Sequence, residues 1–69
     1  MKLKGKEIVV AGLDRSGIGA VKYAVSKGAN VTVVDLRNRL ELQKALSLLK
    51  DYEFKTEFGR YNPKTFSSA

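Results

Sequence analysis

The chain has 69 residues, 43% of them hydrophobic and 29% charged, which is enough for one small folded unit and excludes a two-domain enzyme. It contains no cysteine and no histidine, which excludes disulfides, a Cys/His metal site, a thiol nucleophile and an imidazole base. The net charge of +6 attracts phosphates, but the basic residues are scattered and the lysines at the start have no aromatic neighbours on which bases stack. We therefore expect no nucleic-acid partner and no metal. No apolar run approaches membrane-spanning length or the form of an export signal, which favours a cytoplasmic chain without a membrane partner.

The first part of the chain predicts a strand, a turn and a helix. Residues 7–12 read Glu-Ile-Val-Val-Ala-Gly, a β-branched run typical of a parallel strand buried on both faces. The turn that follows begins at Gly12 and contains Ser16, a residue suited to cap a helix. From Gly17 onward the apolar positions recur at helical spacing for about eleven residues, a common helix length. Gly28 then supplies a left-handed stop.

A second strand, a second helix and a third strand are predicted next. Residues 31–35 form another β-branched run, which completes a strand-helix-strand unit with a right-handed crossover. Asn38 and Glu41 have the spacing of a capping box, and the apolar stripe after them predicts a helix that ends near Asp51. Residues 52–58 alternate aromatic and charged side chains, as expected of an edge strand with one wet face.

Together these elements predict an α/β fold of Rossmann-like, three-layer type. Its partial parallel sheet is built β-α-β-α-β with strand order 3-2-1, and the fourth and later strands are absent. Residues 59–69 are expected to form a loop or a short ragged helix. The first strand lies at the sheet edge, although its sequence is typical of a strand paired on both sides. We therefore expect that the chain is part of a longer parent, or that a second copy associates with it along this exposed edge.

Residues 12–17 have the position of a phosphate-binding βα turn, where helix amides and the helix dipole favour an anion. Gly12 and Gly17 also have structural reasons to be present, because one permits a tight turn and the other permits close packing of helix on strand. Asp35 follows Gly17 by eighteen residues, at the tip of the second strand, where an acid in a dinucleotide fold accepts ribose hydroxyls. An Asp at this place equally well begins a turn. Asp14 stands where the dinucleotide fingerprint has Gly, which argues against an NAD site.

Three further residues extend the candidate site. Arg15 and Ser16 offer a cation and a hydroxyl to a phosphate, and Arg37 offers stacking or hydrogen bonding to a base. Each also has a structural interpretation, because an exposed arginine is ordinarily solvated and a serine before a helix ordinarily caps it.

A family resemblance is carried by several stretches: Lys4-Gly5-Lys6, Ile8-Val9-Val10-Ala11-Gly12-Leu13, Ser16-Gly17-Ile18, Lys27-Gly28-Ala29-Asn30-Val31-Thr32-Val33 and Asp35. Together they resemble the N-terminal domain of the Mur ligases, most closely the branch that adds D-glutamate. The resemblance covers most of the chain up to about Arg37 and is generic beyond it. It implies that residues 1–69 form a single partial N-terminal domain that holds the UDP of a muramoyl substrate. In that family a central domain binds ATP and magnesium, so no cofactor is expected in this chain.

The resemblance also implies two groups of substrate contacts: Arg15, Ser16 and Gly17 at the diphosphate, and Asp35, Leu36 and Arg37 around the uracil and ribose. Gly12, Asp14 and Gly28 are then turn residues. The family usually has Gly at the position of Asp14, and a carboxylate there adds bulk and like-charge repulsion. We therefore expect weak binding of the diphosphate, with the uracil contacts unaffected.

The first functional hypothesis is the UDP-substrate-binding fragment of a cytoplasmic, ATP-dependent, amide-forming ligase of peptidoglycan synthesis, a process on which cell-wall biogenesis, cell shape and cell division depend. The chain lacks the phosphate-binding lysine motif Gly-x-x-x-x-Gly-Lys-Ser/Thr, so no catalysis is expected of it alone. One alternative is a fragment of an NAD(P)-binding domain, from an oxidoreductase or a regulatory sensor. Another is a structural fragment that binds nothing.

Overall fold

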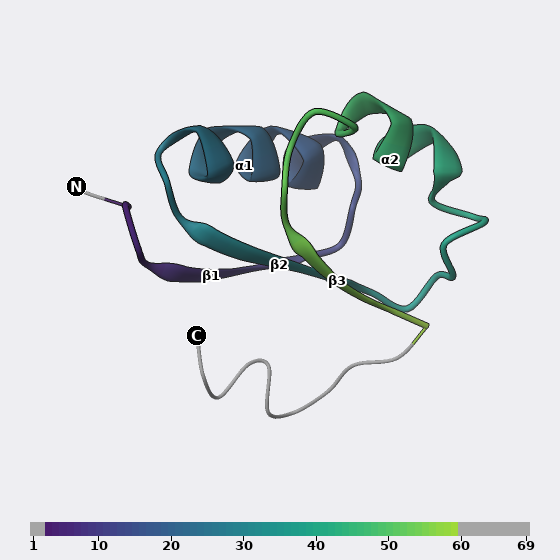
Figure 1. Cartoon of the computed structure of the whole chain (residues 1–69). Helices are drawn as coiled ribbons and strands as arrows, with labels where there is room; N and C mark the ends of the chain where they lie inside the picture. The colour runs from purple at the N-terminus through teal and green to yellow at the C-terminus, as the bar shows by residue number, and fades with distance from the viewer. Residues whose placement is uncertain (1–2, 60–69) are drawn as a thin grey trace.

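The computed structural model describes residues 3–59, which form a three-stranded parallel sheet with both helices on one face (Figure 1). In chain order the elements are β1 (Glu7–Ala11), α1 (Arg15–Ser26), β2 (Asn30–Asp35), α2 (Gln43–Leu48) and β3 (Lys55–Phe58). The strand order β1-β2-β3 places β1 and β3 at the two edges. The predicted α/β Rossmann-like class and strand order are confirmed, and the described residues supply two layers, the sheet and one layer of helices.

The register of the sheet makes β2 its most protected strand. Glu7 pairs with Asn30 and Ala11 with Val34, so the whole of β1 lies beside β2. On the other side β2 pairs with β3 from Thr32 to Asp35. Because β2 has a partner on each side, four of its six residues are buried, including the carboxylate-bearing Asp35 at its end.

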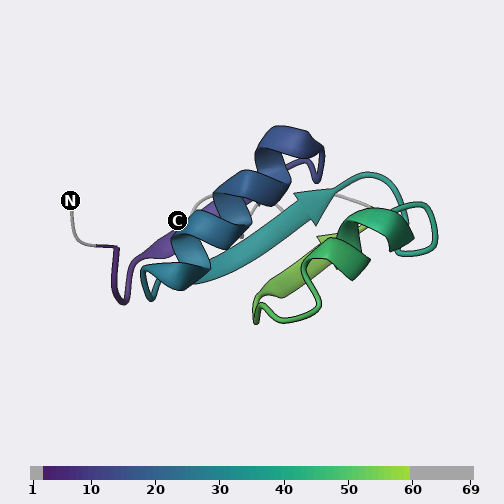
Figure 2. The ribbon, with the colours of Figure 1, turned by 90° about the horizontal axis from the view of Figure 1, so that it is seen from above.

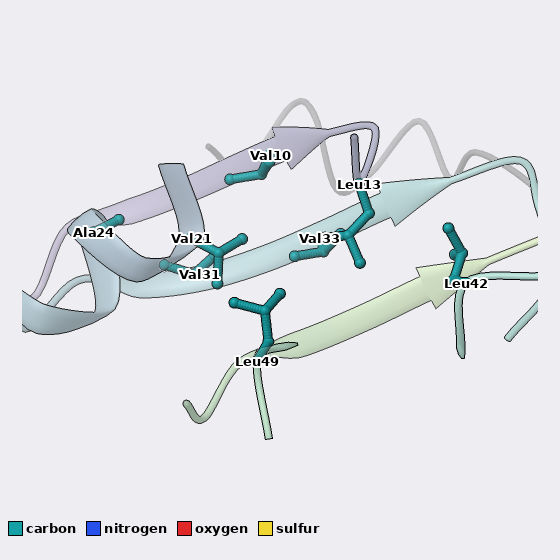
Figure 3. Close-up of a cluster of buried hydrophobic side chains, with 8 residues drawn as sticks. All are labelled: Val10, Leu13, Val21, Ala24, Val31, Val33, Leu42 and Leu49. Atoms are coloured by element: carbon teal, nitrogen blue, oxygen red, sulfur yellow. The ribbon is translucent and has the colours of Figure 1, made fainter. Parts of the chain in front are cut away.

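The hydrophobic core lies between the sheet and the helices (Figure 3). Val21 of α1 and Val33 of β2 are fully buried at its centre. Leu42 and Leu49 flank α2 and are buried as well, whereas none of the six residues within α2 is buried. Helix α2 is therefore held against the sheet by the buried leucines at its two ends, together with the partly buried Ala45 and Leu46 within it. The core comprises Val10, Leu13, Val21, Ala24, Val31, Val33, Leu42 and Leu49.

Helix α1 begins earlier than the sequence predicts, and the expectation that Ser16 caps it is wrong. The helix starts at Arg15, and Asp14 is the cap: its Oδ1 accepts a hydrogen bond of 2.9 Å from the amide of Gly17. The backbone of Asp14 is extended, which is the conformation a capping residue needs, and its carbonyl accepts from the Ile18 amide. At the other end Gly28 has a φ of +84°, so the predicted left-handed stop is confirmed.

Helix α2 is shorter than the predicted helix, although the predicted capping box is present. Asn38 Oδ1 accepts from the Glu41 amide at 2.9 Å, and the Asn38 amide donates to Glu41 Oε1 at 3.1 Å. This box closes a separate turn, because Leu42 has a non-helical backbone while its side chain enters the core. The helix then ends at Leu48, and the Tyr52 amide bonds the Leu49 carbonyl in a turn beyond it.

The third strand is confirmed as an edge strand, with narrower bounds than predicted. It covers Lys55–Phe58, while Tyr52 and Phe54, inside the predicted strand, pack against the core ahead of it. The loop or ragged helix expected at residues 59–69 lies outside the described residues apart from Gly59. Within residues 3–59 no helix has the length and apolar character needed to cross a membrane.

The contact between α1 and the turn before it depends on a glycine. A Cβ on Gly17 would overlap the carbonyl oxygen of Gly12, whereas a Cβ on Gly19, in the same helix, would meet nothing within 4 Å. We expect Gly17→Ala to lower the free energy of unfolding by about 2 kcal/mol or more, because backbone must move aside. Gly19→Ala should raise it by about 0.5–1 kcal/mol through helix propensity. Urea unfolding followed by circular dichroism measures both, and equal values for the two variants would contradict this packing.

Candidate functional site

The candidate site lies where β1 and β2 end at the same edge of the sheet. Parallel strands bring their carboxyl ends together, and ligands of open α/β sheets bind beside such ends. Here the turn after β1 and the segment after β2 are joined by a hydrogen bond of 2.9 Å from the Leu13 amide to Asp35 Oδ2, across 22 residues of sequence. The two segments that the sequence predicts to form one site are therefore in direct contact.

The two glycines of the turn have the roles expected of a phosphate-binding fingerprint. Gly12 has a φ of +93°, which side chains rarely tolerate, and its amide extends the β1–β2 ladder by donating to the Val34 carbonyl at 2.8 Å. Gly17 allows α1 to approach the Gly12 carbonyl. These contacts place the amino end of α1 close to the sheet edge, with its dipole directed there.

Asp35 is buried, with 5% of its surface exposed, and all of its hydrogen-bonding partners belong to this edge. Its Oδ2 accepts from the Leu13 amide and from Arg37 Nη2, the latter at 2.7 Å. Its Oδ1 accepts from the amide and from Nε of Arg37, at 2.9 and 3.0 Å. The Arg37 hydrogen bonds and the backbone amides outweigh desolvation and hold the pKa of the Asp35 carboxyl far below its usual range.

Arg37 is fixed by the same contacts. It forms a forked pair with the carboxylate through Nε and Nη2, and about half of its side chain remains exposed. The Asp35 hydrogen bond raises the pKa of Arg37, and the charges of Glu41 and Asp14 raise it further. Arg37 therefore presents a permanently charged, oriented guanidinium within electrostatic reach of Asp14.

The carboxylate of Asp14 already accepts a hydrogen bond from one of the backbone amides at the amino end of α1. Because Oδ1 accepts from the Gly17 amide, one of the donors that an incoming anion would use at the helix end already has an acceptor. Asp14 itself is exposed, as are Arg15 and Ser16 beside it. The amino end of α1 thus carries one negative and one positive side chain next to each other.

The structure brings the predicted substrate-contact residues of the turn and of residues 35–37 to this edge, whereas Gly28 lies at the opposite end of β2, where its carbonyl accepts from the Gly5 amide. Leu36 is 60% exposed and lies between the buried Asp35 and the paired Arg37. Three hollows of the described residues lie at the amino end of the sheet and around Arg39, and neither residues 12–17 nor residues 35–37 line them. What remains accessible is Arg15, Ser16, Leu36 and the outer part of Arg37, together with backbone.

Arg39 is a cation near this edge that the sequence analysis did not single out. Its Nη2 donates to Thr56 Oγ1 at 2.9 Å, and its guanidinium lies 5.3 Å from the centre of the Phe58 ring. Two sequence features could have pointed to Arg39: it stands two residues after Arg37, and an aromatic residue, Phe58, ends β3. Arg39 extends the positive charge of the edge from β2 to β3.

The contacts of Asp35 predict a pH-dependent contribution to stability. Its pKa is lowered on folding, so the stabilisation is fully present above the unfolded value of about 3.8 and is lost as the pH falls toward the folded value. We expect Asp35→Asn to lower the free energy of unfolding by about 1–3 kcal/mol at pH 6, because the Leu13 amide and Arg37 lose a charged acceptor. Urea titrations at pH 6 and pH 3 should show that the difference in unfolding free energy between Asp35→Asn and the unaltered chain is smaller at the lower pH. The same difference in unfolding free energy at both pH values would contradict the assigned role of the carboxylate.

Comparison with known proteins assigns the chain to a family. Residues 6–69 match the family model of the Mur ligase MurD-like N-terminal domain. The chain is 41% identical over 66 residues to the UDP-N-acetylmuramoylalanine-D-glutamate ligase of Geotalea daltonii, which covers 96% of this chain and 15% of that protein. All 69 residues of the chain are 38% identical to the protein of the same name from Citrifermentans bemidjiense, of which they cover 15%. The protein of that name from Bdellovibrio bacteriovorus is 39% identical over 64 residues, which are 93% of this chain and 14% of the relative. The chain thus spans about one seventh of these curated relatives, and it belongs to the Mur ligase family, as a segment of the MurD-like N-terminal domain.

Proposed function

We propose that this chain supplies the UDP-recognition segment of a ligase of peptidoglycan synthesis that takes a UDP-linked muramoyl substrate. One observation carries the proposal: the hydrogen bond from the Leu13 amide to Asp35 Oδ2 joins the glycine turn to the end of β2, in a chain of the MurD-like N-terminal family. A nucleoside diphosphate has two recognition elements, an anion and a base with its ribose. The joined segments offer one surface for each.

The diphosphate would lie at the amino end of α1. The helix dipole and the first-turn amides favour an anion there, and Arg15 and Ser16 are exposed at that place and add a cation and a hydroxyl. Arg37 lies within electrostatic reach of the same end of the helix, since the charge of Asp14 acts on it. Both side chains carry a guanidinium, whose forked donors match the oxygens of a phosphate.

The uracil and ribose would lie over residues 35–37. Leu36 offers an exposed apolar side chain, and the forked pair with Asp35 fixes the orientation of the planar Arg37 guanidinium. A planar, oriented guanidinium suits stacking on a base. Because Asp35 already accepts four hydrogen bonds within the chain, a ribose hydroxyl that used this carboxylate would share it with Arg37.

Ligation itself is assigned to other parts of a longer protein. The sequence lacks the phosphate-binding lysine motif that would hold ATP, and among residues 3–59 no three acidic side chains gather to hold a metal ion. We include in the proposal that ATP and Mg²⁺ bind to other parts of a longer protein, where the catalytic step takes place. A role with a UDP-linked precursor also suits a cytoplasmic location, which we include in the proposal.

Titration with two nucleotides tests the site. In amide NMR spectra of the ¹⁵N-labelled chain we expect UDP, and not NAD, to shift signals of residues 12–18 and 35–38. Arg15→Ala should weaken UDP binding by about tenfold, because a charge-assisted phosphate contact is lost. Lys22→Ala removes an exposed cation further along the same helix and should leave the affinity unchanged. A response to NAD alone would favour a dinucleotide-binding domain, and a dispersed spectrum unmoved by either nucleotide would contradict the proposal.

Asp14 is expected to limit the affinity for the diphosphate. Asp14→Asn keeps a capping side chain and removes the negative charge. It should tighten UDP binding by about fivefold, because the diphosphate is no longer repelled by a single negative charge near the surface. Asp14→Gly also frees the Gly17 amide and should tighten binding at least as much, with a loss of only a few tenths of a kcal/mol in stability. Isothermal titration calorimetry with UDP measures both, and an unchanged or weaker affinity would argue against this placement of the phosphates.

A further inference from the structure

The segment between β2 and α2 is bonded to the end of β3 as well as to the turn after β1. The amide of Gly59, directly after β3, donates to the carbonyl of Asp35 at 2.9 Å and to that of Arg37 at 3.2 Å. Phe58 is the register partner of Asp35, so β3 ends at the same edge of the sheet as β2. Figure 2 shows the segment at the side of the molecule toward which both strands run. The turn that carries Leu36 therefore has backbone contacts with β3.

Arg39 adds a side-chain contact between this segment and β3. Its Nη2 donates to Thr56 Oγ1 at 2.9 Å, and its guanidinium lies 5.3 Å from the centre of the Phe58 ring. Phe58 packs against the hydrophobic core and Thr56 is half-buried in the strand, so the fold fixes both partners. A guanidinium that donates to one neighbour and lies over the ring of another has a defined orientation. Arg39 thus links an exposed segment to the sheet.

The backbone around Arg39 is closed into a turn. Asn38 and Glu41 exchange the two hydrogen bonds of the capping box, and the Arg39 carbonyl accepts from the amide of Leu42 at 3.2 Å. Leu42 is buried, so this turn is held to the core at its far end. Because Asn38 follows Arg37 directly, a restraint on the turn also restrains the backbone of Arg37.

We propose that Arg39 is a positioning residue for the uridine part of the nucleotide. By holding its segment to β3, it keeps Leu36 and Arg37 in the orientation that receives the base and the ribose. The inference rests on the proposed function, which assigns the base to this segment. In this role Arg39 does not itself touch the ligand, and its engagement with Thr56 and Phe58 favours this role over a direct contact with the diphosphate.

Two variants of Thr56 test the restraint without changing any charge. Thr56→Val keeps the β-branched shape and removes the hydroxyl that accepts from Arg39, whereas Thr56→Ser keeps the hydroxyl. In ¹⁵N relaxation measurements without ligand, we expect the order parameters of residues 36–39 to fall in Thr56→Val from the value of about 0.85 typical of rigid backbone. Thr56→Ser should keep the order of the unaltered chain. Unchanged order in Thr56→Val would overturn the proposal.

Titrations with UDP and with inorganic pyrophosphate, followed by amide NMR, test the consequence for binding. We expect Arg39→Met and Thr56→Val each to weaken UDP binding by about threefold, the size of one exposed contact, while Thr56→Ser binds UDP as the unaltered chain does. Lys44→Met, which removes an exposed cation of α2, gives the effect of net charge alone. Pyrophosphate has no base, so Arg39→Met should bind it as Lys44→Met does, and Thr56→Val as the unaltered chain does.

A direct contact between Arg39 and the diphosphate gives a different pattern. Arg39→Met would then weaken UDP and pyrophosphate equally and Thr56→Val would weaken neither, which would overturn the proposal. An unaltered chain whose spectrum UDP does not move would contradict the proposed function, and the uridine role of Arg39 with it. Where UDP does bind, but Thr56→Val keeps either the order of residues 36–39 or the full affinity, the proposed function stands and the role of Arg39 alone is overturned.

Discussion

The hydrogen bonds of the Asp35 carboxylate hold together the segments that follow β1 and β2 at the carboxyl edge of the sheet. The carboxylate stands at the end of the central strand, accepts from the amide of Leu13 in the preceding turn, and fixes the guanidinium of Arg37 in the following one. A neutral amide in its place has one acceptor oxygen where the carboxylate has two, and so holds the Leu13 amide and the Arg37 guanidinium less well. Because the carboxylate is buried and fully bonded, it remains charged where burial alone would favour protonation. The site is thus preorganised by an interaction inside the protein.

The glycine turn and the Asp35 contact support each other. The positive φ of Gly12 turns the chain directly after β1, and the close approach at Gly17 brings α1 over that turn. This geometry directs the Leu13 amide toward β2, while the Leu13 side chain, 2% exposed, enters the core. Backbone and side chain of one residue therefore connect the core to the candidate site. Changes in the packing of α1 should be transmitted to the edge through this residue.

Asp14 shows how one residue can serve the fold and oppose a ligand. As the cap of α1 it satisfies a helix amide and interacts favourably with the helix dipole. The same negative charge stands where an anion would approach, beside the cations Arg15 and Arg37. A Gly at this position would leave the Gly17 amide free. The balance between a stable helix end and an open anion site is therefore set at a single position.

The class of the fold, the strand order and the two segments that meet at the candidate site could all be predicted from the sequence. Alternation of β-branched runs with helical periodicity is local and strong, and Gly12, Gly17, Gly28 and Asp35 stand at spacings that a strand-helix-strand unit requires. The helix ends and the roles of individual side chains depend instead on tertiary contacts. Asp14 caps α1 in place of Ser16. Helix α2 begins only at Gln43, because Leu42, whose side chain is buried, has a non-helical backbone after the Asn38 capping box. Asp35 was predicted either to accept ribose hydroxyls or to begin a turn, and its Oδ1 accepts from the Arg37 amide as a turn-forming Asp does. Its bond to Leu13 was not predicted, since only folding brings the Leu13 amide to it across 22 residues. Local pattern fixes which elements form, whereas competition among nearby donors and acceptors is resolved only when the elements pack.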